Sequence, residues 1–342
     1  MKILKQAQTI VTDGEIIHLT YFGSKLYGTA HANSDTDVKG IFIPSKRALL
    51  ANNITDSFRF ATNTEKNTKD DFDFECWSIH KLFRLLKVGD TNAFDILFSG
   101  TNKKSVLKTS DMFKYIFTGR HLFLSKNNLL KGNVGYVFRQ LKRFACKGSN
   151  LFVINFVYEY LSKVSDTSEL NEHVDAMIEQ FKKEIVAFSQ DESGDKNEEK
   201  LRVVYSAKGE KFLEVNRDKK FMFNQRVKQI LPSLLNWKNS YGERSKLSLE
   251  SGGVDAKAIS HAWRSIMQTK ELLTGDIKFP LKGSKELLKV KLGDFDFEHT
   301  VSMLEDKILQ LESDIKTSNL PDEVDVQKID TFLQTLLFIY GY

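Results

Sequence analysis

The chain has 342 residues but only two cysteines, Cys76 and Cys146. Two cysteines placed far apart do not have the spacing of metal ligands, which in structural sites come in closely spaced pairs. Chains that rely on disulfides are rich in cysteine and belong to oxidising compartments. We therefore expect a protein of a reducing, cytoplasmic setting.

Long apolar runs are also missing. No stretch approaches the roughly 18 apolar residues that suggest a membrane span, and residues 1–6 lack the apolar core of a secretion signal. The sequence therefore predicts no membrane association.

Proline is scarce, with four residues, whereas there are 26 phenylalanines, which suggests long helices and an aromatic core. Neither charge sign dominates, since 50 basic residues face 45 acidic ones and the formal net charge is +5. This mildly basic balance is compatible with a nucleic-acid partner, but an ordinary soluble protein has it equally often. The length allows two domains with a sizeable core.

The functional interpretation depends on residues 22–30 and the acidic pair that follows them. Upstream, residues 17–22 alternate with the period of a half-buried strand. Gly23 breaks this strand and lets the backbone approach a bulky anion closely. Ser24 can cap a short helix, whose free N–H groups favour phosphate oxygens.

Asp35 and Asp37 follow after a short polar loop. If residues 35–43 form a second strand, its period of two places both carboxylates on one face. Carboxylates paired beside a phosphate-binding turn would make a Mg²⁺ site suited to nucleotide chemistry. Because 45 of the 342 residues are acidic, about six acid-x-acid pairs arise by chance, so the information lies in the order of strand, turn, loop and pair.

This order resembles the signature of the polymerase-beta-type nucleotidyltransferases, in which Gly-Ser is followed after roughly nine to thirteen residues by acid, apolar residue, acid. Ten residues separate Ser24 from Asp35. The departure is Thr36, where the family usually has an apolar residue, although threonine suits a strand. The resemblance implies an α+β fold: a small mixed sheet flanked by helices, then an α-helical domain, with the active site in the cleft between them.

A third carboxylate is expected in the strand predicted for residues 71–77. Alternation places Asp71, Asp73, Glu75 and Trp77 on one face and apolar residues on the other. The carboxylates of the acidic face must be solvated, paired with cations or bound to a metal. From this segment alone, a solvated face and a functional site are equally good interpretations. The resemblance favours Asp73 as the third carboxylate, and Glu75 is the reserve candidate because it shares the face.

A helix with a buried stripe is predicted after Ser78, and Gly89 ends it. The segment that follows is similar to one subgroup, the predicted nucleotidyltransferases associated with bacterial and phage RNA repair. Members read Gly-Asn-Pro-Asn there, with an acid near the end. This chain has Gly89 and Asn92 at the first and last positions, Asp90 and Thr91 between them, and Asp95 as the acid.

A polar row on a predicted helix from residue 135 extends the resemblance. Tyr136, Gln140 and Arg143 fall on a face separate from the apolar stripe. An aromatic ring, an amide and a cation in one row could hold a base and its phosphates. A solvated helix face with long cationic side chains is the alternative, and from the pattern alone it is the favoured one.

A second row occurs in the helix predicted for residues 255–273. Lys257, His261 and Arg264 lie at successive turns of one face, with Gln268 next. Three basic side chains in a row repel one another unless an anion or carboxylates lie opposite. We therefore expect this row to face the Gly23–Asp37 site, although salt bridges to neighbouring helices would also satisfy it.

The two expected domains are residues 1–125, the catalytic domain, and residues 126–342, the α-helical substrate- and nucleotide-binding domain. A mobile loop is expected near residues 188–200, because that segment is too polar to bury apolar surface. The remaining expectations are a hairpin over 201–215 and helices over 221–237, 298–316 and 324–339.

The resemblance implies transfer of a nucleoside monophosphate from an NTP to an acceptor hydroxyl, with an RNA end as the favoured acceptor. Transfer onto a protein hydroxyl and a catalytically silent nucleotide-binding module are the alternatives. The expected catalytic and metal-binding residues, for Mg²⁺ or Mn²⁺, are Asp35, Asp37 and Asp73. The expected nucleotide-binding residues are Gly23, Ser24, Tyr27, Tyr136, Gln140, Arg143, Lys257, His261 and Arg264.

Overall fold

The computed structural model describes residues 2–32, 34–62, 71–188, 199–241, 249 and 255–342. The chain divides into two compact units. The first contains residues 1–139 and 260–342, and the second contains residues 140–259. No boundary between these units lies at residue 125, and the expected catalytic and substrate domains stay a prediction. The loop expected at 188–200 lies largely outside the described residues.

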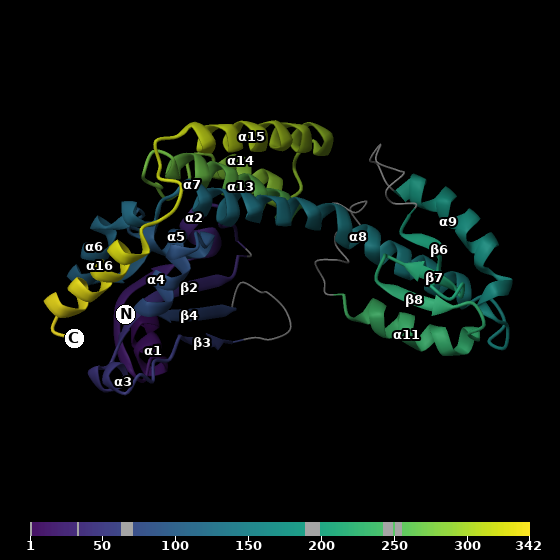
Figure 1. Ribbon diagram of the computed structural model, residues 1–342, viewed down its shortest axis with the longest axis horizontal. Coiled ribbons are helices and arrows are strands. Elements are labelled where there is room, and N and C mark those ends of the chain that lie inside the picture. The colour runs from purple at the N-terminus through teal and green to yellow at the C-terminus, as the bar shows by residue number, and fades with distance from the viewer. Residues whose placement is uncertain (1, 33, 63–70, 189–198, 242–248, 250–254) are drawn as a thin grey trace. The chain divides into compact units, whose positions relative to one another are not determined.

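The first unit is built on a five-stranded sheet, as the α+β expectation requires (Figure 1). The spatial order is β3-β4-β2-β1-β5, in which β2 and β4 are parallel and the other pairs are antiparallel. The sheet is therefore mixed. Its strands are β1 (Gly14–Tyr21), β2 (Thr36–Pro44), β3 (Ser57–Ala61), β4 (Phe72–Ser78) and β5 (Val106–Thr109).

The strand β1 differs from the half-buried strand that its alternation predicts. It lies between β2 and β5, and both its apolar Leu19 and its polar His18 and Thr20 are fully buried. His18 stacks on Phe113 at 3.8 Å between ring centroids, and its Nε2 lies 2.8 Å from the Ser99 hydroxyl. In the sequence His18 counts as a polar residue, so the alternation predicted a solvent-exposed face. In the structure its imidazole is buried and contacts Ser99 and Phe113.

Helices cover both faces of this sheet. The helix α1 (Lys2–Ile10) contributes Ala7 to a buried cluster with residues of β1, β2 and β4. On the other side lie α4 (Ile79–Lys87), α5 (Thr91–Phe98) and α6 (Asp111–Thr118). Side chains cap these three helices at their first turns, since Ser78, Asp90 and Ser110 accept from backbone N–H groups. Shorter helices are α2 (Gly23–Tyr27), α3 (Lys46–Leu50) and α7 (Lys126–Asn128), and a π-helix, η3 (Leu129–Val134), follows α7.

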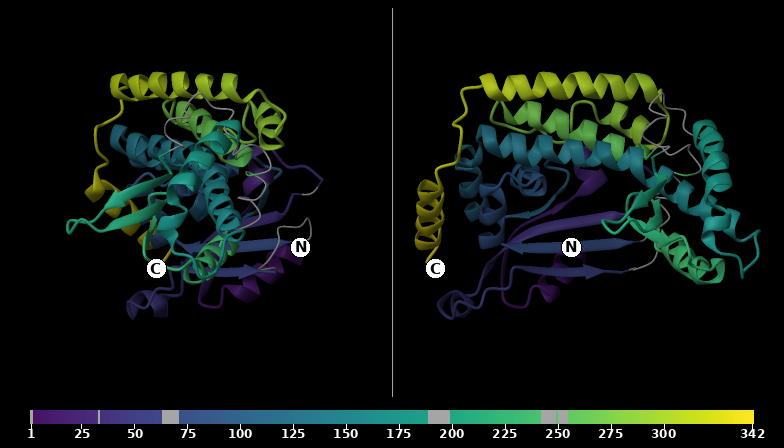
Figure 2. Two further views of the ribbon diagram at one scale, coloured as in Figure 1. Left: turned by 90° about the vertical axis from the view of Figure 1, so that its right-hand side faces the viewer. Right: turned by 45° about the vertical axis from the view of Figure 1, so that its right-hand side comes forward.

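The end of the chain completes the first unit with α13 (Ala256–Leu272), α14 (Ser284–Lys291), α15 (Phe297–Thr317) and α16 (Val326–Ile339). The expectations for α13, α15 and α16 are confirmed to within about two residues. Figure 2 shows α15 lying along α13 and α14. The helix α16 packs on α4 and α6, where Phe332 stacks on Phe83 and Tyr115.

The second unit has its own core. The helix α8 (Gly135–Leu161) enters it and is followed by α9 (Val174–Phe188), a sheet of β6 (Leu201–Tyr205), β7 (Lys211–Val215) and β8 (Lys219–Met222), and α11 (Val227–Asn239). The hairpin expected over 201–215 is confirmed. The helix expected from residue 221 is wrong at its start, because residues 219–222 pair with β7 and the helix begins at Val227. No described helix has the length and apolar character to cross a membrane.

Candidate active site

The Gly-Ser turn follows β1 and lies beside Asp37 of β2. The Phe22 amide donates to the Asp37 carbonyl at 2.8 Å, which joins the end of β1 to β2. At the next residue the backbone enters the left-handed region, with φ of +56° at Gly23, and α2 begins there. This hydrogen bond and turn place the first residues of α2 beside Asp37.

Glycine is required at position 23 for two reasons. A φ of +56° is costly for residues with a Cβ. A Cβ at this position would also lie 2.2 Å from Oδ2 of Asp37, far inside van der Waals contact. The glycine therefore makes room for the carboxylate, a contact that the sequence pattern alone did not predict.

We expect Gly23→Ala to destabilise the protein by more than the backbone cost of about 1–2 kcal/mol. Gly293→Ala is the matched control, because Gly293 has a φ of +84° but a Cβ there would meet no described atom within 4 Å. Urea unfolding of both variants measures the difference, which isolates the clash with Asp37. Equal losses in the two variants would show that the carboxylate moves aside freely.

The role expected for Ser24 as a helix cap is wrong. The helix α2 starts one residue earlier, with Phe22 at the N-cap position and no side-chain cap, so Ser24 lies within the first turn. Its hydroxyl oxygen is buried and has no hydrogen-bond partner among the described residues. A buried hydroxyl without a protein partner suits an external acceptor such as a phosphate oxygen.

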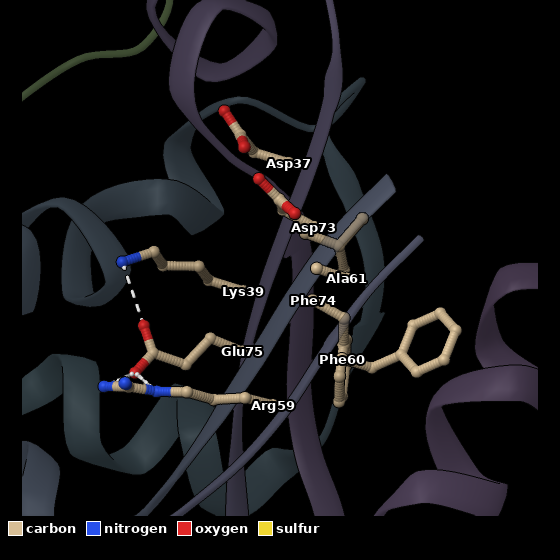
Figure 3. A pocket seen from close by; sticks show the side chains of 9 residues that line it. Asp37, Lys39, Arg59, Phe60, Ala61, Asp73, Phe74 and Glu75 are labelled. Atoms are coloured by element: carbon tan, nitrogen blue, oxygen red, sulfur yellow. Dashed lines mark hydrogen bonds and ion pairs between the residues drawn. The ribbon is translucent and has the colours of Figure 1, made fainter. Parts of the chain in front are cut away.

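The three expected carboxylates lie on adjoining segments. Asp37 is in β2 and pairs in register with Asp73 of the parallel strand β4, so both side chains are on one face (Figure 3). Asp35 precedes β2 directly and is not part of the strand, contrary to the expectation of a strand from residue 35. Burial and the negative charges of Asp35 and Asp71 raise the pKa of Asp73. Asp35 and Asp71 each precede their strand directly, so negative charges gather at the starts of the parallel strands β2 and β4.

The carboxylate of Glu75, the reserve candidate, is engaged in ion pairs with three cationic side chains. It pairs with Lys39 at 3.3 Å, Arg59 at 2.8 Å and Lys81 at 3.5 Å. Burial alone would raise its pKa, but the neighbouring Trp77 and these cations lower it to about 2. Glu75 is therefore a partner of three cations, and Asp73 as the third carboxylate stays a prediction.

Asp37 and Asp73 are among the residues that line a cavity of about 400 Å³. Figure 3 shows these two carboxylates turned to the same side, while Glu75 turns toward Lys39 and Arg59. In the part of the chain that the structure describes, no three His, Cys, Asp or Glu side chains are gathered closely enough to bind a metal as they stand. The chemistry of the donor set still fits Mg²⁺, because Asp35, Asp37 and Asp73 all offer carboxylate oxygens, the ligands that this hard cation prefers.

Behind the turn, Tyr27 belongs to a buried polar network. Its hydroxyl donates to Oδ2 of Asp95 at 2.7 Å, and the Gln268 amide donates to Oδ1 at 2.6 Å. The guanidinium of Arg264 lies over the Tyr27 ring, 4.1 Å from its centroid. Burial raises the pKa of Asp95 to about 6, although the Arg264 charge and the Tyr27 hydrogen bond oppose this. The network joins α2, α5 and α13.

The remaining predicted residues are divided between the two units. Tyr136 is half-buried and close enough to Tyr27 and Arg264 to interact electrostatically with them. His261 is half-buried on α13. Gln140 and Lys257 belong to the second unit, and Gln140 is 3% exposed, so a solvated face is wrong for it. The side chain of Arg143 lies outside the described residues.

The resemblance singled out Asp95 as the acid of the Gly89–Asn92 segment, but sequence reasoning gave it no contacts and assigned Lys39 no role. Asp95 is an acid within the apolar helix α5, which was a further signal. Lys39 lies two residues after Asp37 on β2 and forms an ion pair with Glu75. Its Nζ lies 4.7 Å from the ring centroid of Phe22 and 5.1 Å from that of Trp77. No pattern in the sequence indicated these contacts, because they come from separate strands.

Comparison with known proteins relates the chain to a family and to a phage protein. Residues 1–160 match the model of the RNA repair pathway DNA polymerase beta family. The chain is also similar to an uncharacterised 38.9 kDa protein from the nrdC–mobD intergenic region of Enterobacteria phage T4. The two are 30% identical over 323 residues, which cover 92% of this chain and 95% of the phage protein.

Proposed function

Because the chain belongs to the RNA repair pathway DNA polymerase beta family, we propose that it is a nucleotidyltransferase acting on an RNA end. It would move a nucleoside monophosphate from an NTP to a hydroxyl of the acceptor. The observation that carries this proposal is the register that puts Asp73 beside Asp37, next to the Gly23 turn. Carboxylates converging beside a turn with an unpartnered hydroxyl suit phosphoryl chemistry.

In this proposal the acceptor hydroxyl attacks the α-phosphorus of the NTP. A new oxygen–phosphorus bond forms, the bond to the β-phosphate breaks, and pyrophosphate leaves. Asp73 takes the proton of the attacking hydroxyl, because its carboxylate lies in register beside Asp37 at the site. The Gly23 amide and the Ser24 hydroxyl donate to oxygens of the leaving phosphates. Positioning and neutralisation of charge supply most of the rate.

Asp35, Asp37 and Asp73 would hold the divalent cations, Mg²⁺ or Mn²⁺. When bound, these ions neutralise the phosphate charges and favour ionisation of the acceptor hydroxyl. The residues supply oxygen ligands only, which suits these hard cations.

The direct phosphate contact expected of Arg264 stays a prediction, and its surroundings support a positioning role. The residue is 8% exposed, and its side chain covers the Tyr27 ring. The negative charge of Asp95 nearby stabilises the positive charge of its guanidinium. We assign it to holding α2 in place beneath the nucleotide. Contacts of Tyr136, Gln140, Arg143, Lys257 and His261 with the nucleotide remain predictions.

The direct test is transfer of label. The protein is incubated with Mg²⁺ and each α-³²P-labelled NTP, together with total RNA or with total protein. Label in the RNA fraction supports the proposal, whereas label only in the protein fraction would support transfer onto a protein hydroxyl. No transfer with any NTP, while the protein still binds nucleotide, would favour the silent binding module.

A buried free thiol at Cys76 is consistent with a reducing, cytoplasmic setting for this reaction.

A comparison of Asp73→Asn with Glu75→Gln tests which acid is the third carboxylate. We expect Asp73→Asn to lower kcat by about 10²–10⁴-fold, the usual contribution of a general base. Glu75→Gln should change kcat by less than about tenfold and act on stability, because its carboxylate is held by three cations. Turnover at saturating Mg²⁺ measures both effects. A severe loss only in Glu75→Gln would exchange the two roles.

A further inference from the structure

A second cavity in the first unit shares no residue with the cavity beside Asp37. It has a volume of about 270 Å³ and lies where the turn between α4 and α5 meets η3 and the start of α8. Its lining residues are Val88, Asp90, Thr91, Asn92, Lys131, Gly132, Tyr136 and Arg139. The volume is a little below that of small-molecule sites, about 300–1,000 Å³. It therefore suits part of a nucleotide, such as its phosphate group, and not a whole triphosphate with its base.

The backbone fixes the shape of this cavity. A Cβ at Gly132 would lie 2.0 Å from the carbonyl oxygen of Gly89, and a Cβ at Gly89 would lie 2.6 Å from that of Asn128. Gly89 also has a φ of +72°. The two segments thus touch through their main chains, and the π-helical turn η3 is part of this contact. The lining side chains are presented by a close-packed frame.

The charges of the cavity favour an anion. Lys131 and Arg139 are both exposed, and neither has an ion-pair partner among the residues that the structure describes. The one acid, Asp90, is engaged as the cap of α5, where its carboxylate accepts from the Ala93 amide at 3.0 Å. A planar guanidinium and an ammonium are the usual ligands of phosphate groups.

Tyr136 adds an aromatic surface to these cations. Its ring lies beside the guanidinium of Arg139, 6.0 Å from centroid to Cζ. Cationic side chains next to an aromatic ring are the combination that binds single-stranded nucleic acid, since the ring stacks on a base and the cations contact phosphates. The shared chemistry is a nucleotide phosphate, which could come from an RNA strand or from a free nucleotide.

We propose that this cavity binds a phosphate of the RNA acceptor strand, with Lys131 and Arg139 as its ligands; this rests on the proposed function. The phosphates of the incoming NTP are assigned to the Gly23 turn in that function. An acceptor that itself carries phosphates along its chain can occupy a second phosphate site in the same compact unit. A protein acceptor has no need of it, so the cavity favours RNA.

The test measures binding of a short fluorescein-labelled single-stranded RNA by anisotropy, with no NTP and no divalent cation. We expect the double variant Lys131→Glu, Arg139→Glu to weaken binding at least tenfold. The slope of log Kd against log salt should fall by about 0.7 for each lost phosphate contact. The control is Lys5→Glu, Lys270→Glu, which changes two exposed lysines of the first unit and alters the net charge equally. It should weaken binding less than threefold.

Equal weakening in the two double variants would overturn the proposal, because general charge would then explain the loss. Unchanged binding in the Lys131, Arg139 variant would overturn it as well. If AMP displaces the RNA and the same variant loses AMP binding, the cavity is a free-nucleotide site and the strand assignment is wrong. In the transfer assay, single Arg139→Glu should raise the KM for RNA while kcat stays within about threefold. Because RNA binding is measured without transfer, failure of the proposed activity leaves this test intact.

Discussion

Asp37→Asn is expected to reduce nucleotide transfer by about 10²–10³-fold, the loss of several kcal/mol of charge stabilisation. Asparagine has the shape of aspartate but no negative charge, so it retains the packing against Gly23 while weakening cation binding. Single-turnover transfer at saturating NTP and Mg²⁺ measures the chemical step.

The magnitude follows from the position of Asp37 between two other site elements. On one side it packs on the Gly23 turn, and on the other it is in register with Asp73. A charge lost at this point affects the contacts to the nucleotide phosphates and to the acceptor hydroxyl together. We therefore expect the loss of activity to appear as a lower kcat. Excess Mg²⁺ should restore only part of that activity.

Asp56→Asn is the matched control for Asp37→Asn, because Asp56 forms an ion pair with Arg84 in which the side chains are 54% and 59% exposed. Its turnover should be close to that of the unaltered protein. Thermal unfolding of both variants shows whether each is folded. Asp37→Asn that is folded and retains more than a tenth of the activity would remove Asp37 from the catalytic residues.

Asp95→Ala is expected to lower the stability of the protein by about 3–5 kcal/mol, or its Tm by roughly 6–20 °C. Asp95 is 1% exposed and accepts hydrogen bonds from Tyr27 and Gln268. Without it, the buried Arg264 loses its nearby countercharge and two buried donors lose their acceptor. Calorimetry of the unaltered protein and the variant measures the effect.

Asp56→Ala serves as the control here too, since an exposed ion pair contributes about 0–1 kcal/mol. A second variant, Asp95→Leu with Arg264→Met, should recover part of the stability, because apolar residues of similar volume often replace a buried ion pair without loss. Asp95→Ala that unfolds no earlier than Asp56→Ala would show that Arg264 does not depend on Asp95. Because Tyr27 is in α2, loss of transfer activity in folded Asp95→Ala would support a positioning role for the network.

Local patterns predicted much of the first unit. The end of a strand near Gly23, a strand that carries Asp37 and the capped helix after Ser78 all follow from neighbouring residues, and the structure contains each of them, although Asp35 lies just outside the strand predicted for it. The errors at Ser24 and at residue 221 are also local, since each concerns where an element begins. Helix and strand ends depend on capping and pairing partners that propensity does not contain.

The sequence by itself determined that the chain has a Gly-Ser turn followed by two aspartates, and its resemblance indicated the nucleotidyltransferase family. This was possible because the spacing of these residues is local and does not depend on packing. The tertiary structure decided which acids are available. Asp73 and Glu75 share a face in the sequence pattern, but only Glu75 receives three cations, which come from β2, β3 and α4. Asp95 and Gln268, 173 positions apart, become partners only when α5 and α13 pack together, because a hydrogen bond needs atoms within about 3 Å.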